Sequence, residues 1–209
     1  EIISNVSCYN FDDGLIDLSV NGGVSPYSYV WNTSNITNYL DSLSPGIYTV
    51  DILDSNNCIK QESFTISEPD SLFIFFQFSD VSCYGYQDGT IDISILGGTS
   101  PFLYNWNNGS FLTEDIANLS VGNYFIEVTD DNQCQISDSI LISENQQIVL
   151  NLDTIVHLQC FEIPTGEISV STTGGVVPFN YSWNDSTTLD SYRYNLSAGT
   201  YNIVVSDGN

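Results

Sequence analysis

The sequence predicts an all-β protein built from three tandem repeats of about 75 residues. Cysteines mark the period, because Cys8 and Cys83 are 75 residues apart and Cys83 and Cys160 are 77 apart. The tryptophans repeat the same two steps, at Trp31, Trp106 and Trp183. Short runs rich in β-formers alternate with turn signals, and no stretch has a convincing helical period. We therefore place the repeats at 1–68, 69–145 and 146–209.

The first repeat contains six expected strands. Its leading strand is short, and a turn follows at Asp13-Gly14 because glycine tolerates the positive φ that many turns require. The pair Gly22-Gly23 ends the next strand, while the stretch 33–43 is the least regular part and is expected to return as a strand. The expected strands are 1–7, 15–20, 27–31, 33–43, 47–53 and 59–66.

The second and third repeats follow the same order with longer leading strands, at 72–78 and 148–156. Only 68–70 and 144–146 separate neighbouring repeats. Linkers this short leave little independent motion, so we expect a semi-rigid rod. The third repeat ends before the position of its second cysteine, and residue 1 begins no signal peptide. We expect a piece of a longer chain.

The recurring aromatic residues predict the core of an immunoglobulin-like antiparallel β-sandwich. Each tryptophan lies on the third strand of its repeat, where such sandwiches bury one. The alternative is an exposed platform that stacks on sugars. A tyrosine two residues after a turn glycine fits a tyrosine corner, whose ring covers the core and whose hydroxyl bonds to backbone. These tyrosines are Tyr48, Tyr124 and Tyr201.

Composition restricts the partners. The chain has 26 Asp and Glu against two Lys and Arg, a formal net charge of −24. This charge disfavours nucleic acid and anionic membranes, and no apolar run reaches the roughly 18 residues that a membrane span needs. Divalent cations and basic surfaces fit the charge better. The alternative is that the acidity only keeps a long secreted molecule soluble.

The cysteine spacing predicts one disulfide inside each complete repeat. The spacings, 50 from Cys8 to Cys58 and 51 from Cys83 to Cys134, match no zinc motif. If six strands alternate in direction, the turns after the first and before the last strand share an end and the cysteines can meet. Seven strands would place them at opposite ends. Six strands also bring both termini of a repeat to one end, which suits a straight rod poorly unless the leading strand bends.

We therefore predict the disulfides Cys8–Cys58 and Cys83–Cys134, with Cys160 unpaired because the chain ends at Asn209. Such bonds predict an oxidising, extracellular setting. The single histidine, His157, completes no catalytic arrangement with cysteine or serine. We expect no enzyme.

Turn carboxylates suggest a calcium site, since calcium prefers oxygen ligands from loops. The six-strand arrangement would bring together Asp12, Asp13, Asp54 and Asn56, with Asp88, Asp130 and Asn132 as the second-repeat counterparts. The alternative is ordinary turn chemistry, because Asp and Asn are common turn residues and the third repeat has Pro164-Thr165 in place of Asp12-Asp13. We expect no other cofactor.

Several Asp-Ser or Asp-Thr pairs precede an apolar residue or Thr. They make Ser42, Ser71, Ser139, Thr154 and Ser186 candidates for O-glycosylation. The alternative is that such triplets arise freely in a chain rich in Asp and Ser.

The combined motif resembles the SprB-type repeat of gliding-motility and other cell-surface adhesins of Bacteroidetes. It reads Cys-x5-Gly-x-Ile, Gly-Gly-x2-Pro-aromatic-x-Tyr-x-Trp, Leu-Ser-x-Gly-x-Tyr and Asp-x-Asn-x-Cys. All three repeats carry it, the first with an apolar residue at the variable position of Gly-x-Ile (Gly-Leu-Ile), while the third departs at Pro164-Thr165 and lacks its closing cysteine. The resemblance implies type IX secretion, display at the cell surface and O-glycosylation at the Asp-Ser/Thr triplets.

We expect the repeat region of a very long secreted adhesin, acting as a stalk that contacts extracellular surfaces or polysaccharide through its parent protein. Copies of itself and the secretion or motility machinery are further expected partners. The alternatives are a carbohydrate-binding or spacer module of a secreted polysaccharide-degrading enzyme, and a static surface-layer or matrix protein. An exposed aromatic row would favour the module, whereas burial of all three tryptophans would favour the stalk.

Overall fold

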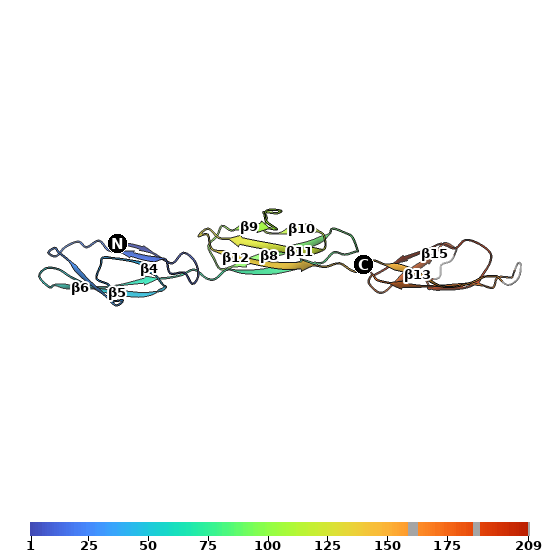
Figure 1. Cartoon of the computed structure of the whole chain (residues 1–209), viewed down its shortest axis with the longest axis horizontal. Coiled ribbons are helices and arrows are strands. Elements are labelled where there is room, and N and C mark those ends of the chain that lie inside the picture. The colour runs from blue at the N-terminus through green and yellow to red at the C-terminus, as the bar shows by residue number, and fades with distance from the viewer. Residues whose placement is uncertain (159–162, 186–188, 209) are drawn as a thin grey trace. The chain divides into compact units, whose positions relative to one another are not determined.

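The computed structural model describes residues 1–158, 163–185 and 189–208, and every regular element in these ranges is a β-strand (Figure 1). This confirms the all-β prediction. Within the same ranges, no helix offers the length and apolar character needed to cross a membrane.

The first repeat is a sandwich of two three-stranded antiparallel sheets. One sheet has the order β1-β2-β4 and the other β3-β5-β6. The strand bounds are β1 Ile2–Ser4, β2 Gly14–Asp17, β3 Ser28–Trp31, β4 Tyr39–Leu43, β5 Gly46–Leu53 and β6 Ile59–Ile66. The irregular stretch 33–43 is a strand only in its last five residues.

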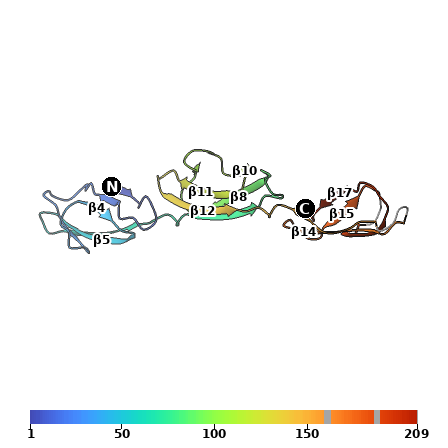
Figure 2. The ribbon, with the colours of Figure 1, turned by 45° about the vertical axis from the view of Figure 1, so that its right-hand side comes forward.

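The second repeat has the same topology, with sheets β7-β8-β10 and β9-β11-β12. Its strands are β7 Phe73–Ser79, β8 Gly89–Leu96, β9 Leu103–Trp106, β10 Ile116–Leu119, β11 Gly122–Thr129 and β12 Gln135–Ile142. In the third repeat the sheets are β13-β14-β16 and β15-β17. These strands are β13 Val149–Val156, β14 Gly166–Thr173, β15 Asn180–Trp183, β16 Tyr192–Leu196 and β17 Ile203–Ser206. Figure 2 shows β14, β15 and β17 of the third repeat together.

The core of each sandwich is built around its tryptophan. Trp31, Trp106 and Trp183 are at most 5% exposed, which confirms their predicted burial. Each indole N–H donates to a backbone carbonyl, that of Thr37 in the first repeat at 2.8 Å, so burial leaves no unpaired donor. The tyrosine-corner prediction is also confirmed. The hydroxyls of Tyr48, Tyr124 and Tyr201 donate to the carbonyls four residues earlier, at 2.8 to 3.0 Å.

Strand directions place the two cysteines of one repeat at opposite ends. β2 runs antiparallel to β4, β3 runs antiparallel to β5, and only two residues join β4 to β5. β3 and β4 therefore run in the same direction although they are consecutive. As a result, Cys8 follows β1 at one end and Cys58 follows β5 at the other. The eight residues of β5 alone separate these ends by about 26 Å.

We call these the first-turn end, which carries Cys8 or Cys83, and the last-turn end, which carries Cys58 or Cys134. The chain divides into two compact units. The first comprises Glu1–Phe76, Asp92–Glu114 and Phe125–Ser139, and the second Gln77–Ile91, Asp115–Tyr124 and Ile140–Asn209. The first-turn end of the first repeat and the last-turn end of the second thus belong to one unit.

Candidate functional site

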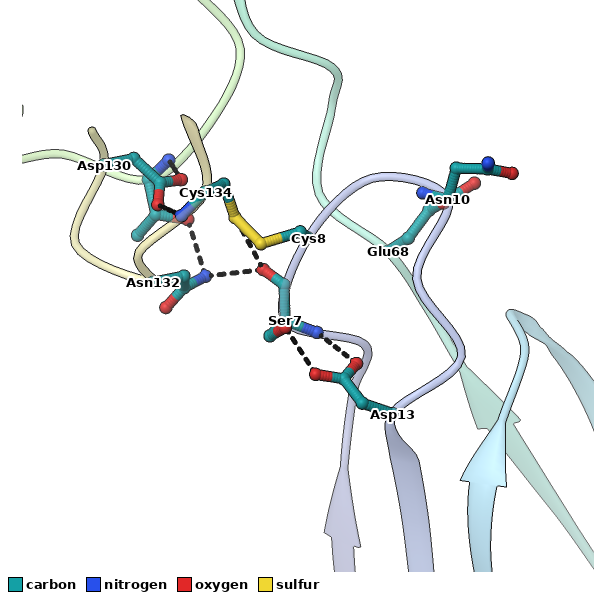
Figure 3. The surroundings of a disulfide bond; sticks show 9 residues. Ser7, Cys8, Asn10, Asp13, Glu68, Asp130, Asn132 and Cys134 are labelled. Atoms are coloured by element: carbon teal, nitrogen blue, oxygen red, sulfur yellow. Dashed lines mark hydrogen bonds between the residues drawn. A yellow bond between two sulfur atoms is a disulfide. The ribbon is translucent and has the colours of Figure 1, made fainter. Parts of the chain in front are cut away.

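A disulfide joins the first repeat to the second. Cys8 and Cys134 are bonded, with sulfurs 2.05 Å apart and Cα atoms 5.6 Å apart, across 126 residues of sequence (Figure 3). Cys58 is exposed and Cys83 half-buried, and neither is in a disulfide. The predicted pairs Cys8–Cys58 and Cys83–Cys134 are therefore wrong. Cys160, predicted to be unpaired, lies outside the described residues.

The prediction failed on one assumption, that consecutive strands alternate in direction. The chain passes from β3 in one sheet to β4 in the other without reversing. The six strands therefore place the two cysteines at opposite ends of the repeat, as seven alternating strands would have done. The same step puts the start and end of a repeat at opposite ends, because β1 begins near the end of β2 and β6 ends beside Val6. The last-turn cysteine of the following repeat can then reach Cys8.

Side chains hold the first turn in shape next to the disulfide. The backbone N–H of Ser7 donates to Asp13 at 2.9 Å, and the Ser7 hydroxyl donates to the other oxygen of the same carboxylate. The N–H of Asn10 donates to Glu68 at 2.7 Å, which ties the turn to the start of the linker. These hydrogen bonds fix the turn that carries Cys8, whose side chain is only 5% exposed in the disulfide.

Asp130 organises the last turn of the second repeat. Its side chain is buried and accepts from the backbone N–H groups of Cys134 at 2.8 Å and Thr99 at 2.9 Å. Two residues on, the Asn132 amide donates to the carbonyl of Ser7 at 3.1 Å and to the Thr99 hydroxyl at 3.2 Å. Asn132 therefore connects the two repeats beside the disulfide, as Figure 3 shows.

The linker also packs onto this end. The N–H of Gly98 donates to the carbonyl of Asp70 at 3.0 Å, and Leu72 is buried against Gly98. A Cβ on Gly98 would come within 2.4 Å of Leu72 Cδ2, and one on Gly97 within 2.0 Å of the Ser71 carbonyl oxygen. Both glycines also have positive φ. The Gly-Gly pair thus leaves room for the linker as well as making a turn.

The second repeat reproduces the first-turn contacts. Ser82 donates through its N–H to Asp88 at 3.0 Å, and the N–H of Gly85 donates to Glu144 at 2.8 Å. The two aspartates are also stabilised in the same charged form. The hydrogen bond from the Ser7 hydroxyl lowers the pKa of Asp13, and the one from the Ser82 hydroxyl lowers the pKa of Asp88. The first-turn end is therefore formed both with the disulfide and without it.

Within one repeat, the predicted calcium ligands do not come together. Asp12 and Asp13 lie at the first-turn end, whereas Asp54 and Asn56 lie at the last-turn end. Asp88 is separated in the same way from Asp130 and Asn132. In the ranges the structure describes, no group of three His, Cys, Asp or Glu side chains is placed to hold a metal. Asp54 instead accepts from backbone, and the N–H of Cys58 is the main cause of its lowered pKa. Calcium binding stays a prediction, but the expected convergence of the two turns of one repeat does not support it.

The candidate glycosylation residues differ in access. Ser42, Ser139 and Thr154 are exposed, whereas Ser71 is half-buried next to Gly97. Ser186 lies outside the described residues. Modification at each of them stays a prediction.

Sequence reasoning missed Leu72, the Asn132 bridge and the pairing between repeats. A signal for the pairing was present in the awkward placement of both termini at one end. In a straight array, the chain must enter each repeat at one end and leave it at the other. That path also places the two cysteines of a repeat at opposite ends.

The comparison with protein families gave matches in all three repeats. The SprB repeat matches residues 1–35, 76–111 and 152–188, which together are more than half of the chain. The search of curated proteins found no match.

Proposed function

The chain belongs to the SprB repeat family, and from this premise we propose that it forms a load-bearing stalk in a secreted cell-surface adhesin. SprB repeats are structural repeats of cell-surface adhesin-type proteins. The stalk would extend a binding region away from the cell and would need neither catalysis nor a cofactor. Its partners would be extracellular surfaces or polysaccharide, reached through the parent protein.

The disulfide between Cys8 and Cys134 carries this proposal. A tensile force applied at the chain ends passes through this bond and bypasses the residues that it encloses. Those residues cannot be pulled out while the bond is intact, even if both sandwiches lose their fold. Bonds inside each repeat would have left the linker and the outer strands open to extension. A bond that spans two repeats is therefore suited to a part that must keep its length.

Pulling single molecules tests the stalk. Extended chain measures about 3.5 Å per residue, so unfolding the reduced protein should release about 440 Å more length than unfolding the oxidised protein. The variant Cys134→Ser should behave like the reduced protein under oxidising conditions. Equal lengths for the oxidised and reduced proteins would overturn the load-bearing role.

Gliding motility is a separate part of the proposal and needs a test on cells. An antibody raised against this chain, applied to live cells, should label filaments that travel along the surface. Static label would favour the surface-layer or matrix alternative. Label confined to the medium would favour a secreted enzyme.

One observation favours a second candidate, a carbohydrate-binding module. Phe73 and Phe75 lie on β7 with more than half of their surface exposed, as a sugar platform requires. The corresponding residues of β13 are Val149 and Asn151, however, so the aromatic pair is not repeated. The burial of all three tryptophans also supports the stalk. Retention on insoluble polysaccharide that disappears in Phe73→Ala/Phe75→Ala would support the module.

A further inference from the structure

Each repeat displays one large aliphatic side chain in the segment between its third and fourth strands. These side chains belong to Ile36, Leu112 and Leu189, and their exposed fractions are 76%, 71% and 65%. They recur with the period of the array, since the steps from one to the next are 76 and 77 residues. We call them the loop knobs. Nothing in the proposed stalk function uses them.

The tryptophan of each repeat holds the backbone beside its knob. In the first two repeats the backbone N–H of the tryptophan donates to the carbonyl of the residue before the knob, and the indole N–H donates to the carbonyl of the residue after it. The acceptors and N···O distances are Asn35 at 3.0 Å and Thr37 at 2.8 Å for Trp31, and Phe111 at 3.0 Å and Thr113 at 3.1 Å for Trp106. The indole of Trp183 makes the second of these bonds, to Asp190 at 2.9 Å. A buried residue thus fixes the backbone next to an exposed one, which lowers the entropy cost of binding through the knob.

Other aliphatic side chains are as exposed as the knobs, but they do not recur. Single exposed apolar residues are common on protein surfaces and need no explanation. Ile47, Leu103 and Val204 are examples, with 64%, 66% and 68% of their surface exposed. Polar residues take the corresponding positions of the other repeats, namely Asn123 and Thr200 for Ile47, Ser28 and Asn180 for Leu103, and Asp51 and Glu127 for Val204. The loop knobs, by contrast, are apolar in all three repeats.

The loops around the first two knobs carry no charge. The segments 32–38 and 107–113 contain only Asn, Thr, Ser and Gly besides Ile36, Phe111 and Leu112. The chain as a whole has a formal net charge of −24, so two copies repel each other over most of their surface. A contact made through these loops adds no like charge from the side of the knob.

A cavity suited to an aliphatic side chain lies at the junction of the first and second repeats. It measures about 370 Å³ and is lined by the first turn, the linker and the last turn around Cys8 and Cys134. We call it the junction hollow. Its apolar lining consists of Tyr9, Phe11, Pro69, Leu72 and Ile136, all within one compact unit. Tyr9 and Phe11 are each 54% exposed, so the lining includes apolar surface that an occupant would cover.

From these observations we propose that copies of this chain bind each other side by side, with a loop knob of one copy in the junction hollow of another. The hollow is large enough for an Ile or Leu side chain. The aromatic residues of the hollow also recur, because Tyr84 and Tyr86 take the positions of Tyr9 and Phe11 in the next first turn. Two arrays with one period can form the contact at several repeats at once, and the combined affinity then exceeds that of one contact.

The knob and the hollow are different parts of the surface, so the contact is heterologous. Each contact leaves free knobs on one copy and a free hollow on the other, and assembly continues. The expected product is a series of oligomers, and hence a bundle of stalks, in place of a closed dimer. This association goes beyond the load-bearing role, which pulling on single molecules tests separately.

Sedimentation of the purified chain tests the association. The free thiols are first blocked with iodoacetamide, and the chain is studied in about 1 M NaCl, which screens charges beyond about 3 Å. The average mass should rise with protein concentration. The variant Ile36→Thr/Leu112→Thr/Leu189→Thr should associate at least about tenfold more weakly, because burying a single aliphatic side chain contributes about that factor. The matched control removes equally exposed side chains and should associate like the unchanged chain; it is Ile47→Thr/Leu103→Thr/Val204→Thr.

Cross-linking locates the contact. A photoreactive p-benzoylphenylalanine in place of Leu112, irradiated in a mixture with an isotope-labelled chain, should link to labelled peptides that contain Tyr9 and Phe11 or Ile136. A chain that stays monomeric at high salt, equal weakening in the two triple variants, or cross-links mainly outside the hollow would overturn the inference. Retention of a monomeric chain on methyl-terminated surfaces, lost in the knob variant, would also overturn it and assign the knobs to an apolar substrate.

Discussion

Both ends of the first repeat carry a cysteine in a turn, but only one of the two cysteines is in a disulfide. At the first-turn end Cys8 is bonded and buried, and at the last-turn end Cys58 is exposed. The second repeat has the reverse arrangement, with Cys134 bonded and Cys83 free. All four turns are held by an aspartate that accepts from backbone. The turns are therefore set by their own sequence, and the same kind of turn occurs both with a disulfide and without one.

The largest effect is expected from removing the bonded cysteine. Cys134→Ser should lower the free energy of unfolding of the first two repeats by about 4 kcal/mol, since the chain-entropy model gives about 4 to 5 kcal/mol for a loop of this size. Cys58→Ser is the matched control and should change it by less than about 0.5 kcal/mol, because an exposed free thiol closes no loop. Urea denaturation followed by tryptophan fluorescence measures both. Equal losses would mean that the turn sequence and not the bond provides the stability.

A glycine pair gives the next comparison. Gly22 and Gly97 both have positive φ, so alanine should cost about 1 to 2 kcal/mol at either position through the backbone alone. Only at Gly97 would the new Cβ meet a backbone atom, the Ser71 carbonyl oxygen. Gly97→Ala should therefore cost about 2 kcal/mol more than Gly22→Ala, because the linker must move. Thermal unfolding of the two variants measures the difference. A similar cost for both would show that the linker contact adds no stability.

Much of the fold could be predicted from the sequence because its signals are local. The period is visible directly as the constant spacing of cysteines and tryptophans, and the buried tryptophans and the tyrosine corners each depend on residues within one strand or turn. The last strand of the first repeat, 59–66, was predicted with the bounds that the structure gives it.

The site was harder to predict because it depends on the direction of two strands in different sheets. The stretch between Trp31 and Tyr39 has no strong pattern, and this stretch decides whether β3 and β4 run the same way. An error there moves Cys58 from one end of the repeat to the other. The pairing then changes from Cys8–Cys58 to Cys8–Cys134, and the carboxylates expected to share a calcium ion are separated as well.

The smallest effect is expected from acid, and it compares a bonded first turn with a free one. The Ser7 and Ser82 hydroxyls are the main cause of the lowered pKa values of Asp13 and Asp88. A carboxyl with a lowered folded pKa stabilises the fold above its unfolded pKa, about 3.9, and this contribution is lost as the pH falls through the folded value. Ser7→Ala and Ser82→Ala should each raise the pKa of the neighbouring aspartate and move acid unfolding to a slightly higher pH. Fluorescence during titration from pH 7 downward measures this shift. Equal shifts would show that the turn alone sets these pKa values, whereas a shift only in Ser7→Ala would show that the disulfide takes part.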